Sequence, residues 1–176
     1  MIYRSVEDAI EKAFSVVGYE AAVPSVNPAD LAGAEYDHTP RPASELTRMD
    51  WHAQHGMTAR LIRDALGGPE AAQYLTMLVR YCYEPGARVK AITELAAHVP
   101  QRLPQGKRKA VIAVTLTALR MTHDQIDNGD GTKRSTLDRH IGEIRRQLNQ
   151  WQNAAFSHIG RVLKDAGLLE ECEEVA

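Results

Sequence analysis

Two arginines and a glycine in the last third of the chain are spaced for contact with DNA. Arg139, Gly142 and Arg146 follow one another at intervals of three and four residues, which places them on one face of a helix. The guanidinium fork of arginine fits guanine edges and phosphate groups, and a glycine lets another molecule approach the helix backbone closely. These residues predict a helix that lies on duplex DNA, although ordinary solvated helix faces also show this pattern.

The helix that carries these residues is predicted from the spacing of its apolar side chains. Ser135 or Thr136 is expected to cap its N-terminus, and Ala166-Gly167 to end it. The polar face opposite the apolar stripe also includes Gln150 and Asn153. The predicted buried stripe consists of Leu137, Ile141, Ile144, Leu148, Trp151, Ala155, His158 and Val162.

This long stripe fits two arrangements. Its alternating steps of four and three residues are typical of a dimerising coiled coil, and a long helix that crosses a bundle within one chain shows the same pattern. We favour the bundle because Phe156, Ile159 and Leu163 widen the apolar face beyond a two-stranded seam. A break into two helices between Asn149 and Asn153 is a further alternative.

The charge of the chain is distributed unevenly. The formal net charge is −2, but residues 101–148 contain ten basic and five acidic residues, so this segment carries +5 and the remainder −7. A basic segment in an acidic protein suits a polyanion that approaches from one side. The residues predicted to hold a DNA backbone are Lys107, Arg108, Lys109, Lys133, Arg134, Ser135 and Thr136.

The rest of the chain predicts an all-α fold, a multi-helix bundle with a helix-turn-helix-like element and a long terminal helix. Three regions are expected: an N-terminal helix and proline-containing arm (1–43), a helical body (44–104) and a basic DNA-binding region (105–176). Gly18 and Gly67-Gly68 are predicted helix stops. The helices expected before the long one are Ser5–Val17, Ser44–Leu66, one that starts at Pro69 and reaches Tyr83, one from Ala87 to Val99 after a turn at Pro85-Gly86, and Lys107–Met121.

Other chemistry finds little support in the sequence. The chain has no glycine-rich phosphate loop and no nucleophile motif, so we predict neither an enzyme nor a cofactor. His52 and His55 lack a third metal ligand, and the acids of residues 124–130 fit no calcium-loop register. Because the chain has no apolar run long enough to cross a bilayer and only two cysteines, we expect a cytoplasmic protein.

Residues 136–149 resemble the recognition helix of LuxR-type helix-turn-helix domains. The likeness rests on the Thr136-Leu137 pair followed by His140, Ile141, Ile144 and Leu148. The resemblance implies that this helix enters the major groove, with Lys133, Arg134, Thr136 and Arg139 near phosphates and bases. Residues 126–131 read as turns where the family has a short helix, so the first helix of the motif would be the one predicted over residues 107–121. In architecture, the chain is also similar to small phage regulators such as late-gene antiterminators.

These observations predict a sequence-specific double-stranded DNA-binding protein, a transcription regulator of a phage or bacterium. RNA polymerase is a predicted partner, and a homodimer through the C-terminal helix is a predicted assembly. The alternative is a helical interaction or self-assembly module, for example a small phage packaging subunit, in which the apolar stripe rather than the arginine face is functional.

Overall fold

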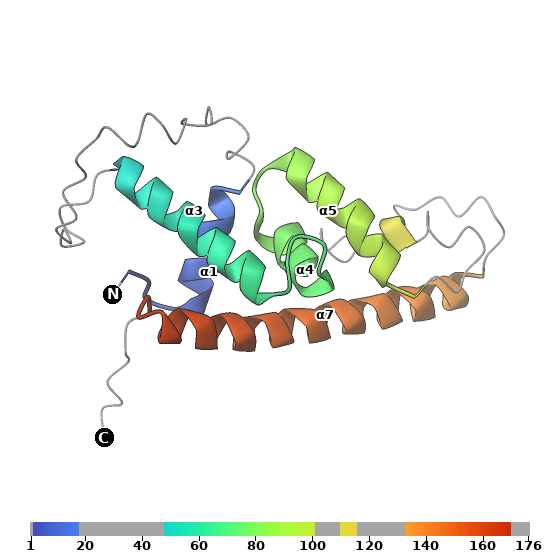
Figure 1. Cartoon of the computed structure of the whole chain (residues 1–176). Helices are drawn as coiled ribbons and strands as arrows, with labels where there is room; N and C mark the ends of the chain where they lie inside the picture. Colours follow the sequence, from blue (N-terminus) through green and yellow to red (C-terminus); the bar gives the residue numbers. More distant parts are fainter. Residues whose placement is uncertain (1, 18–47, 101–109, 116–132, 170–176) are drawn as a thin grey trace, which may run out of the picture.

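The computed structural model describes residues 2–17, 48–100, 110–115 and 133–169, and in this part the chain is all-α. Its named helices are α1 (Val6–Ser15), α3 (Arg48–Ala65), α4 (Ala72–Tyr81), α5 (Pro85–His98) and α7 (Arg134–Asp165), and residues 110–115 form a further short helical segment. The predicted all-α bundle with a long terminal helix is confirmed. In Figure 1, α7 runs along the lower edge and the other helices all lie on one side of it.

Helix α1 forms because its capping signal and its apolar spacing agree. The hydroxyl of Ser5 accepts a hydrogen bond from the backbone N–H of Asp8 at 3.1 Å, and Lys12 bonds to the Asp8 carboxylate one turn later. Partial burial works to raise the pKa of Asp8, but hydrogen bonds from Lys12 and the Arg4 backbone outweigh it and lower the pKa. The predicted helix is confirmed, although it ends at Ser15 rather than Val17.

The connection between α3 and α4 corrects the prediction for Pro69. Gly67 and Gly68 have φ values of 94° and 97°, a left-handed conformation that glycine adopts at low cost, and they end α3 as predicted. The turn then continues, because the N–H of Ala71 bonds to the carbonyl of Gly68 at 3.3 Å. Pro69 therefore lies within this turn and not in the first turn of the next helix, which begins at Ala72.

Helix α5 begins two residues earlier than predicted. The carboxylate of Glu84 accepts hydrogen bonds from the backbone N–H groups of Gly86 and Ala87, and these bonds lower the pKa of Glu84. Pro85 is the first helical residue, where its missing N–H would have had no partner in the helix. The predicted turn at Pro85-Gly86 is thus the first turn of the helix itself.

Helix α7 is continuous over 32 residues, so the alternative of a break between Asn149 and Asn153 is wrong. Its predicted start is also wrong, because Lys133 is the N-cap and Ser135 and Thr136 lie in the first turn. The predicted end is confirmed. Gly167 is left-handed at φ 65°, and the N–H of Leu168 bonds back to the carbonyl of Leu163 at 2.9 Å, as in other glycine-terminated helices.

The buried side of α7 departs from the predicted heptad spacing after Ala155. Ile141, Ile144, Leu148 and Ala155 are buried as predicted, and so are Ile159 and Leu163, which the sequence placed beside the stripe. His158 is exposed, so its assignment to the buried stripe is wrong, and Val162 is half-buried. From Ala155 the buried positions advance in steps of four, through Ile159 to Leu163, and no longer alternate between four and three. Trp151 is half-buried, and the side chain of Leu137 lies outside the described residues.

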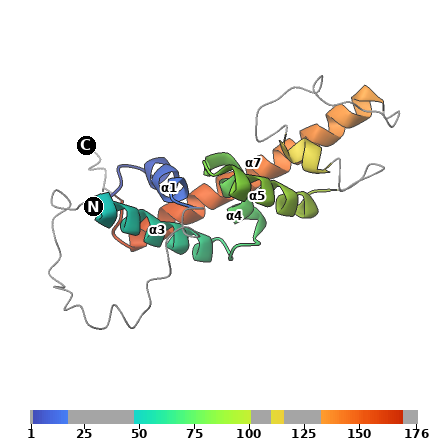
Figure 2. The same ribbon diagram turned by 90° about the horizontal axis from the view of Figure 1, so that it is seen from above.

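The apolar stripe of α7 is covered by other helices of the same chain. Helix α7 packs against α1, α3 and α4, and the turned view shows these helices arranged along it (Figure 2). The core draws residues from all three predicted regions, for example Phe14, Met77 and Ile144, each of which is fully buried. The intramolecular arrangement that we favoured from the sequence is therefore the one observed.

Both ends of the described chain meet beside α3. The backbone N–H of Tyr3 bonds to the carbonyl of Leu168 at 3.0 Å, and Tyr3 forms an isolated parallel bridge with Leu169. The buried Tyr3 hydroxyl lies 2.9 Å from Thr58 Oγ1 and 2.9 Å from His55 Nδ1. Since Thr58 donates its hydrogen to the carbonyl of Gln54, Tyr3 donates to Thr58 and His55 must donate through Nδ1.

This contact predicts a stability that depends on pH. Burial, aided by the nearby positive charges of Lys12 and His52, lowers the pKa of His55 from its ordinary 6.5. The unfolded chain therefore binds a proton more readily than the folded chain, and stability falls as pH drops below about 6.5. The carboxylate of Asp8, whose pKa is lowered from 3.8, stays ionised between about pH 5 and pH 7.5 and does not contribute to this change in stability.

We expect the thermal midpoint to be lower at about pH 5 than at about pH 7.5, by more in the natural protein than in a His55→Asn variant. The asparagine amide can place an N–H donor where Nδ1 of His55 lies, toward Tyr3, but it does not titrate. An equal loss of stability in the two proteins would show that His55 is not responsible.

A second prediction concerns the close approach of α7 to α1 at Gly160. A Cβ atom at this position would lie 3.3 Å from Val6 Cγ2, which is tighter than ordinary contact. Alanine is favoured over glycine inside a helix by about 1 kcal/mol, and here the crowding opposes that gain. We expect Gly160→Ala to raise the free energy of unfolding in urea by less than about 1 kcal/mol, or to lower it. In a protein that already carries Val6→Ala, the same change should raise it by the full amount. A full gain in the single variant would contradict the contact.

Candidate nucleic-acid interface

The predicted polar face of α7 faces solvent. Ser135, Arg139, Arg146, Gln150 and Asn153 are all exposed, on the side opposite the buried stripe. Because the stripe is packed against the bundle, the rotation of α7 about its axis is fixed and these side chains must face outward. The face that the sequence assigned to DNA is thus an accessible surface of the folded chain.

Arg139 and Arg146 are placed on this surface two helical turns apart. At a rise of 1.5 Å per residue their Cα atoms are separated by about 10 Å along the axis. Arg146 Nε approaches the carbonyl of Gly142 at 3.4 Å, on its own helix. Arg145 is also exposed, so this end of α7 presents three guanidinium groups to solvent.

Gly142 departs from the prediction in one respect, because it is half-buried and not fully exposed. A Cβ atom added there would meet no described atom within 4 Å. Gly160 on the same helix has a packing reason, namely Val6, whereas no side chain of the described residues requires a glycine at position 142. A glycine inside a helix is less stable than an alanine by about 1 kcal/mol. The close approach of another molecule to the helix backbone would explain why a glycine is present at position 142 despite this cost.

The remaining predicted DNA-binding residues lie at or before the start of α7. Lys133 and Ser135 are exposed, and Thr136 is half-buried. Arg134 is the first residue of the helix, but its side chain lies outside the described residues, as do Lys107, Arg108 and Lys109. The structure therefore brings Lys133, Ser135, Arg139 and Arg146 onto one accessible surface and does not describe the basic run at 107–109.

The charge of this surface is positive. Residues 133–146 contain five lysines and arginines against two acids, Asp138 and Glu143, which gives a net charge of +3. Two surface cations on other helices pair with acids on their own helix: Lys12 with Asp8 at 2.9 Å and Lys90 with Glu94 at 3.9 Å. Arg139 and Arg145 have no such ion pair within the described part of the chain.

One cation beside this surface was not predicted from the sequence. Arg80, on α4, donates a hydrogen bond from Nη2 to the side-chain carbonyl of Asn149 at 2.8 Å and another from Nη1 to Gln152. Gln152 in turn donates to the hydroxyl of Tyr81 at 3.3 Å. Burial, and next the charge of Glu7, raise the pKa of Tyr81. No sequence signal could identify Arg80, because it lies 69 residues from Asn149.

The helix-turn-helix element lies largely outside the described residues. Residues 110–115 are helical and fall within the helix predicted over 107–121, but residues 116–132 separate them from Lys133 and are not described. In both ribbon views, the short segment lies near the C-terminal end of α5 and beside α7 (Figures 1 and 2). The turn and the crossing of the two helices stay predictions.

Two other kinds of site were searched for in the described ranges. No group of three or more His, Cys, Asp or Glu side chains there is arranged to hold a metal ion. None of the helices in the same ranges combines the length and the apolar character needed to cross a membrane. The exposed face of α7 is therefore the surface on which we base the functional argument.

Comparison of the chain with protein-family models, with curated proteins and with solved structures found no match to any of them. The functional argument accordingly depends on the geometry and charge of the chain itself.

Proposed function

We propose that the protein binds double-stranded DNA in a sequence-specific manner through the outward face of α7 and acts as a transcription regulator of a phage or bacterium. The observation that carries the proposal is the exposed, arginine-rich face at residues 139–146, held outward by the buried stripe behind it. The proposal is for a binding protein and not for an enzyme.

The shape of the molecule supports this use of α7. The helix lies alone at one edge of the described bundle, so its outward side is not flanked by another described helix (Figure 1). The major groove of B-DNA is about 12 Å wide and admits a single α-helix. A helix that projects from one side of a bundle can therefore enter the groove, while the other helices stay outside the phosphate backbone.

The side chains on this face supply both kinds of contact that DNA recognition requires. Arginine at positions 139 and 146 can form paired hydrogen bonds with guanine edges or with phosphates. Lys133 and the N-terminal end of α7, where no side chain of the N-cap residue bonds to the helix backbone, suit phosphate oxygens. Glu143, which lies among these cations, opposes the approach of DNA and limits the strength of binding without a matching base sequence.

In the proposed role in transcription, the protein would contact RNA polymerase as well as DNA. RNA polymerase would be met by a surface away from the outward face of α7, since that face would be occupied by DNA. The apolar stripe of α7 is buried within the chain and is not available for this purpose. A homodimer, if it forms, must accordingly use a surface other than this stripe.

The first test removes the two arginines together. We expect Arg139→Ala with Arg146→Ala to weaken binding to duplex DNA and, if both contact phosphate, to reduce the slope of log K against log salt by about 2. An arginine that reads a base should instead cost about 1–3 kcal/mol at one base position. Fluorescence anisotropy of labelled duplexes across a range of salt concentrations measures both effects.

The matched control for this test is an arginine on another helix. Arg60 is exposed on α3, and Arg60→Ala removes a similar charge without touching α7. Unchanged binding of the double α7 variant, or an equal loss in the Arg60 variant, would contradict the assignment of the interface to α7. Absence of any duplex binding by the natural protein at low salt would overturn the proposed function itself.

A further prediction separates the effect of Gly142 on the stability of the fold from its proposed effect on DNA binding. Because an added Cβ meets no described atom, Gly142→Ala should stabilise the fold by about 1 kcal/mol. The same methyl group would stand between the helix backbone and the DNA, so binding should weaken while stability rises. Urea denaturation and the anisotropy titration measure the two effects, and stronger DNA binding by the more stable variant would exclude close approach at Gly142.

A further inference from the structure

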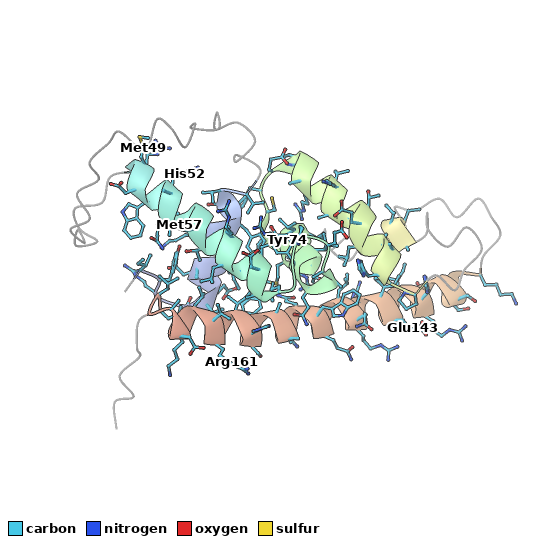
Figure 3. The ribbon with its side chains drawn as sticks, viewed as in Figure 1. Met49, His52, Met57, Tyr74, Glu143 and Arg161 are labelled. Atoms are coloured by element: carbon cyan, nitrogen blue, oxygen red, sulfur yellow. The ribbon has the colours of Figure 1, made fainter. Side chains whose placement is uncertain are left out.

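The outward face of α7 continues well past the residues that the sequence resemblance covers. Beyond Arg146 it carries two amides, a hydroxyl and two further cations, and all five side chains are exposed: Gln150, Asn153, Ser157, Arg161 and Lys164. Figure 3 shows Arg161 extending from the side of α7 that faces away from the other helices. Because α7 is unbroken, the two parts of this face form one surface.

The second half of this face is unusual in its charge. From residue 144 to residue 164 the sequence contains four lysines and arginines and no aspartate or glutamate. Arg161 and Lys164 form no ion pair within the described ranges, in contrast to the paired cations of α1 and α5. Glu143 and the exposed Asp165 border this stretch, but the stretch itself lacks acids and carries cations at both ends, which is favourable for a polyanion.

The polar side chains between the cations are available for recognition. The side-chain amide of Gln150 makes no hydrogen bond to any described residue, and that of Asn153 likewise has none, since Ser157 bonds to the Asn153 backbone carbonyl at 3.1 Å. Side-chain amides are the groups that pair with both hydrogen-bonding atoms of an adenine edge. Asn149, in contrast, is occupied by Arg80.

The spacing of the two cation pairs matches a duplex surface. The midpoints of Arg139 with Arg146 and of Arg161 with Lys164 are twenty residues apart, or about 30 Å along the helix. At one base pair per 3.4 Å, this length corresponds to at most about nine base pairs, and to fewer where the helix is inclined to the duplex axis. The DNA groove curves away from a straight helix, so long side chains suit the two ends, where phosphates must be reached, and short amides suit the centre.

We propose that α7 contacts one duplex along its whole outward face, with Arg161 and Lys164 as a second phosphate contact and Gln150 and Asn153 as residues that face the bases between the two cation pairs. This inference rests on the proposed function. It assigns DNA contacts to Arg161 and Lys164, which the sequence did not predict, and it gives Gln150 and Asn153, which lie on the predicted face, the role of base contacts in the middle of the helix.

The test compares the salt dependence of duplex binding in full-length variants. We expect Arg161→Ala with Lys164→Ala to reduce the slope of log K against log salt by about 2, since each phosphate contact contributes about 0.9. The matched control, Arg48→Ala with Arg60→Ala, removes two exposed cations from α3 that form no ion pair with a described residue, and it should leave the slope unchanged. Thermal unfolding of each variant verifies that the fold is retained.

A second variant tests the amides against a duplex selected from random sequences by the natural protein. We expect Gln150→Ala with Asn153→Ala to reduce the preference for the selected duplex over a random one at least tenfold, with an unchanged salt slope.

The outcomes distinguish the two proposals. Absence of duplex binding by the natural protein would overturn both of them. Binding by the natural protein with an unchanged salt slope in the Arg161 and Lys164 variant would overturn only the extended interface and leave the function at residues 133–146 standing. A reduced slope with an unchanged preference in the amide variant would overturn the assignment of base contacts to Gln150 and Asn153.

Discussion

Burial of one side of α7 is the interaction on which the rest of the described structure depends. Ile144, Leu148, Ile159 and Leu163 are almost completely removed from solvent by α1, α3 and α4. Each fully buried side chain of this size contributes roughly 1.5–3 kcal/mol, so the four together contribute roughly 6–12 kcal/mol, which is comparable to the net stability of a whole domain. The same burial determines which side of the helix is left for function.

Specific contacts fix the position of α7 more narrowly than the apolar stripe could. The missing Cβ of Gly160 allows α1 to approach at Val6, and Arg80 of α4 holds the amides of Asn149 and Gln152. Beyond the end of α7, the backbone carbonyl of Leu168 accepts hydrogen bonds from the backbone N–H groups of Ile2 and Tyr3. These contacts limit sliding and rotation of the helix, which a uniform apolar stripe would tolerate, and so they keep the arginine face directed to solvent.

The sequence predicted the helices better than their ends. The periodic apolar residues and the glycine stops identified α1, α3, α4, α5 and α7, because a helix in water needs one apolar face to pack and a signal to stop. Pro69 was misplaced because the turn continues to Ala71, and the start of α7 was misplaced because a plausible cap, Ser135, lies inside the helix. His158 was misplaced because the alternating steps of four and three were continued past Ala155, where the buried positions advance by four residues.

By itself, the sequence determined that one side of the last helix is apolar and the other rich in arginine and amides, since side-chain type and a period of 3.6 residues suffice for that. Only the tertiary structure decided that the apolar side is covered within the chain, that Arg80 joins the polar side from α4, and that the exposed face runs unbroken to Lys164. The physical reason is that helical periodicity is a local property of the chain. Which surface covers a helix depends on the packing of residues far apart in sequence, and no local pattern encodes it.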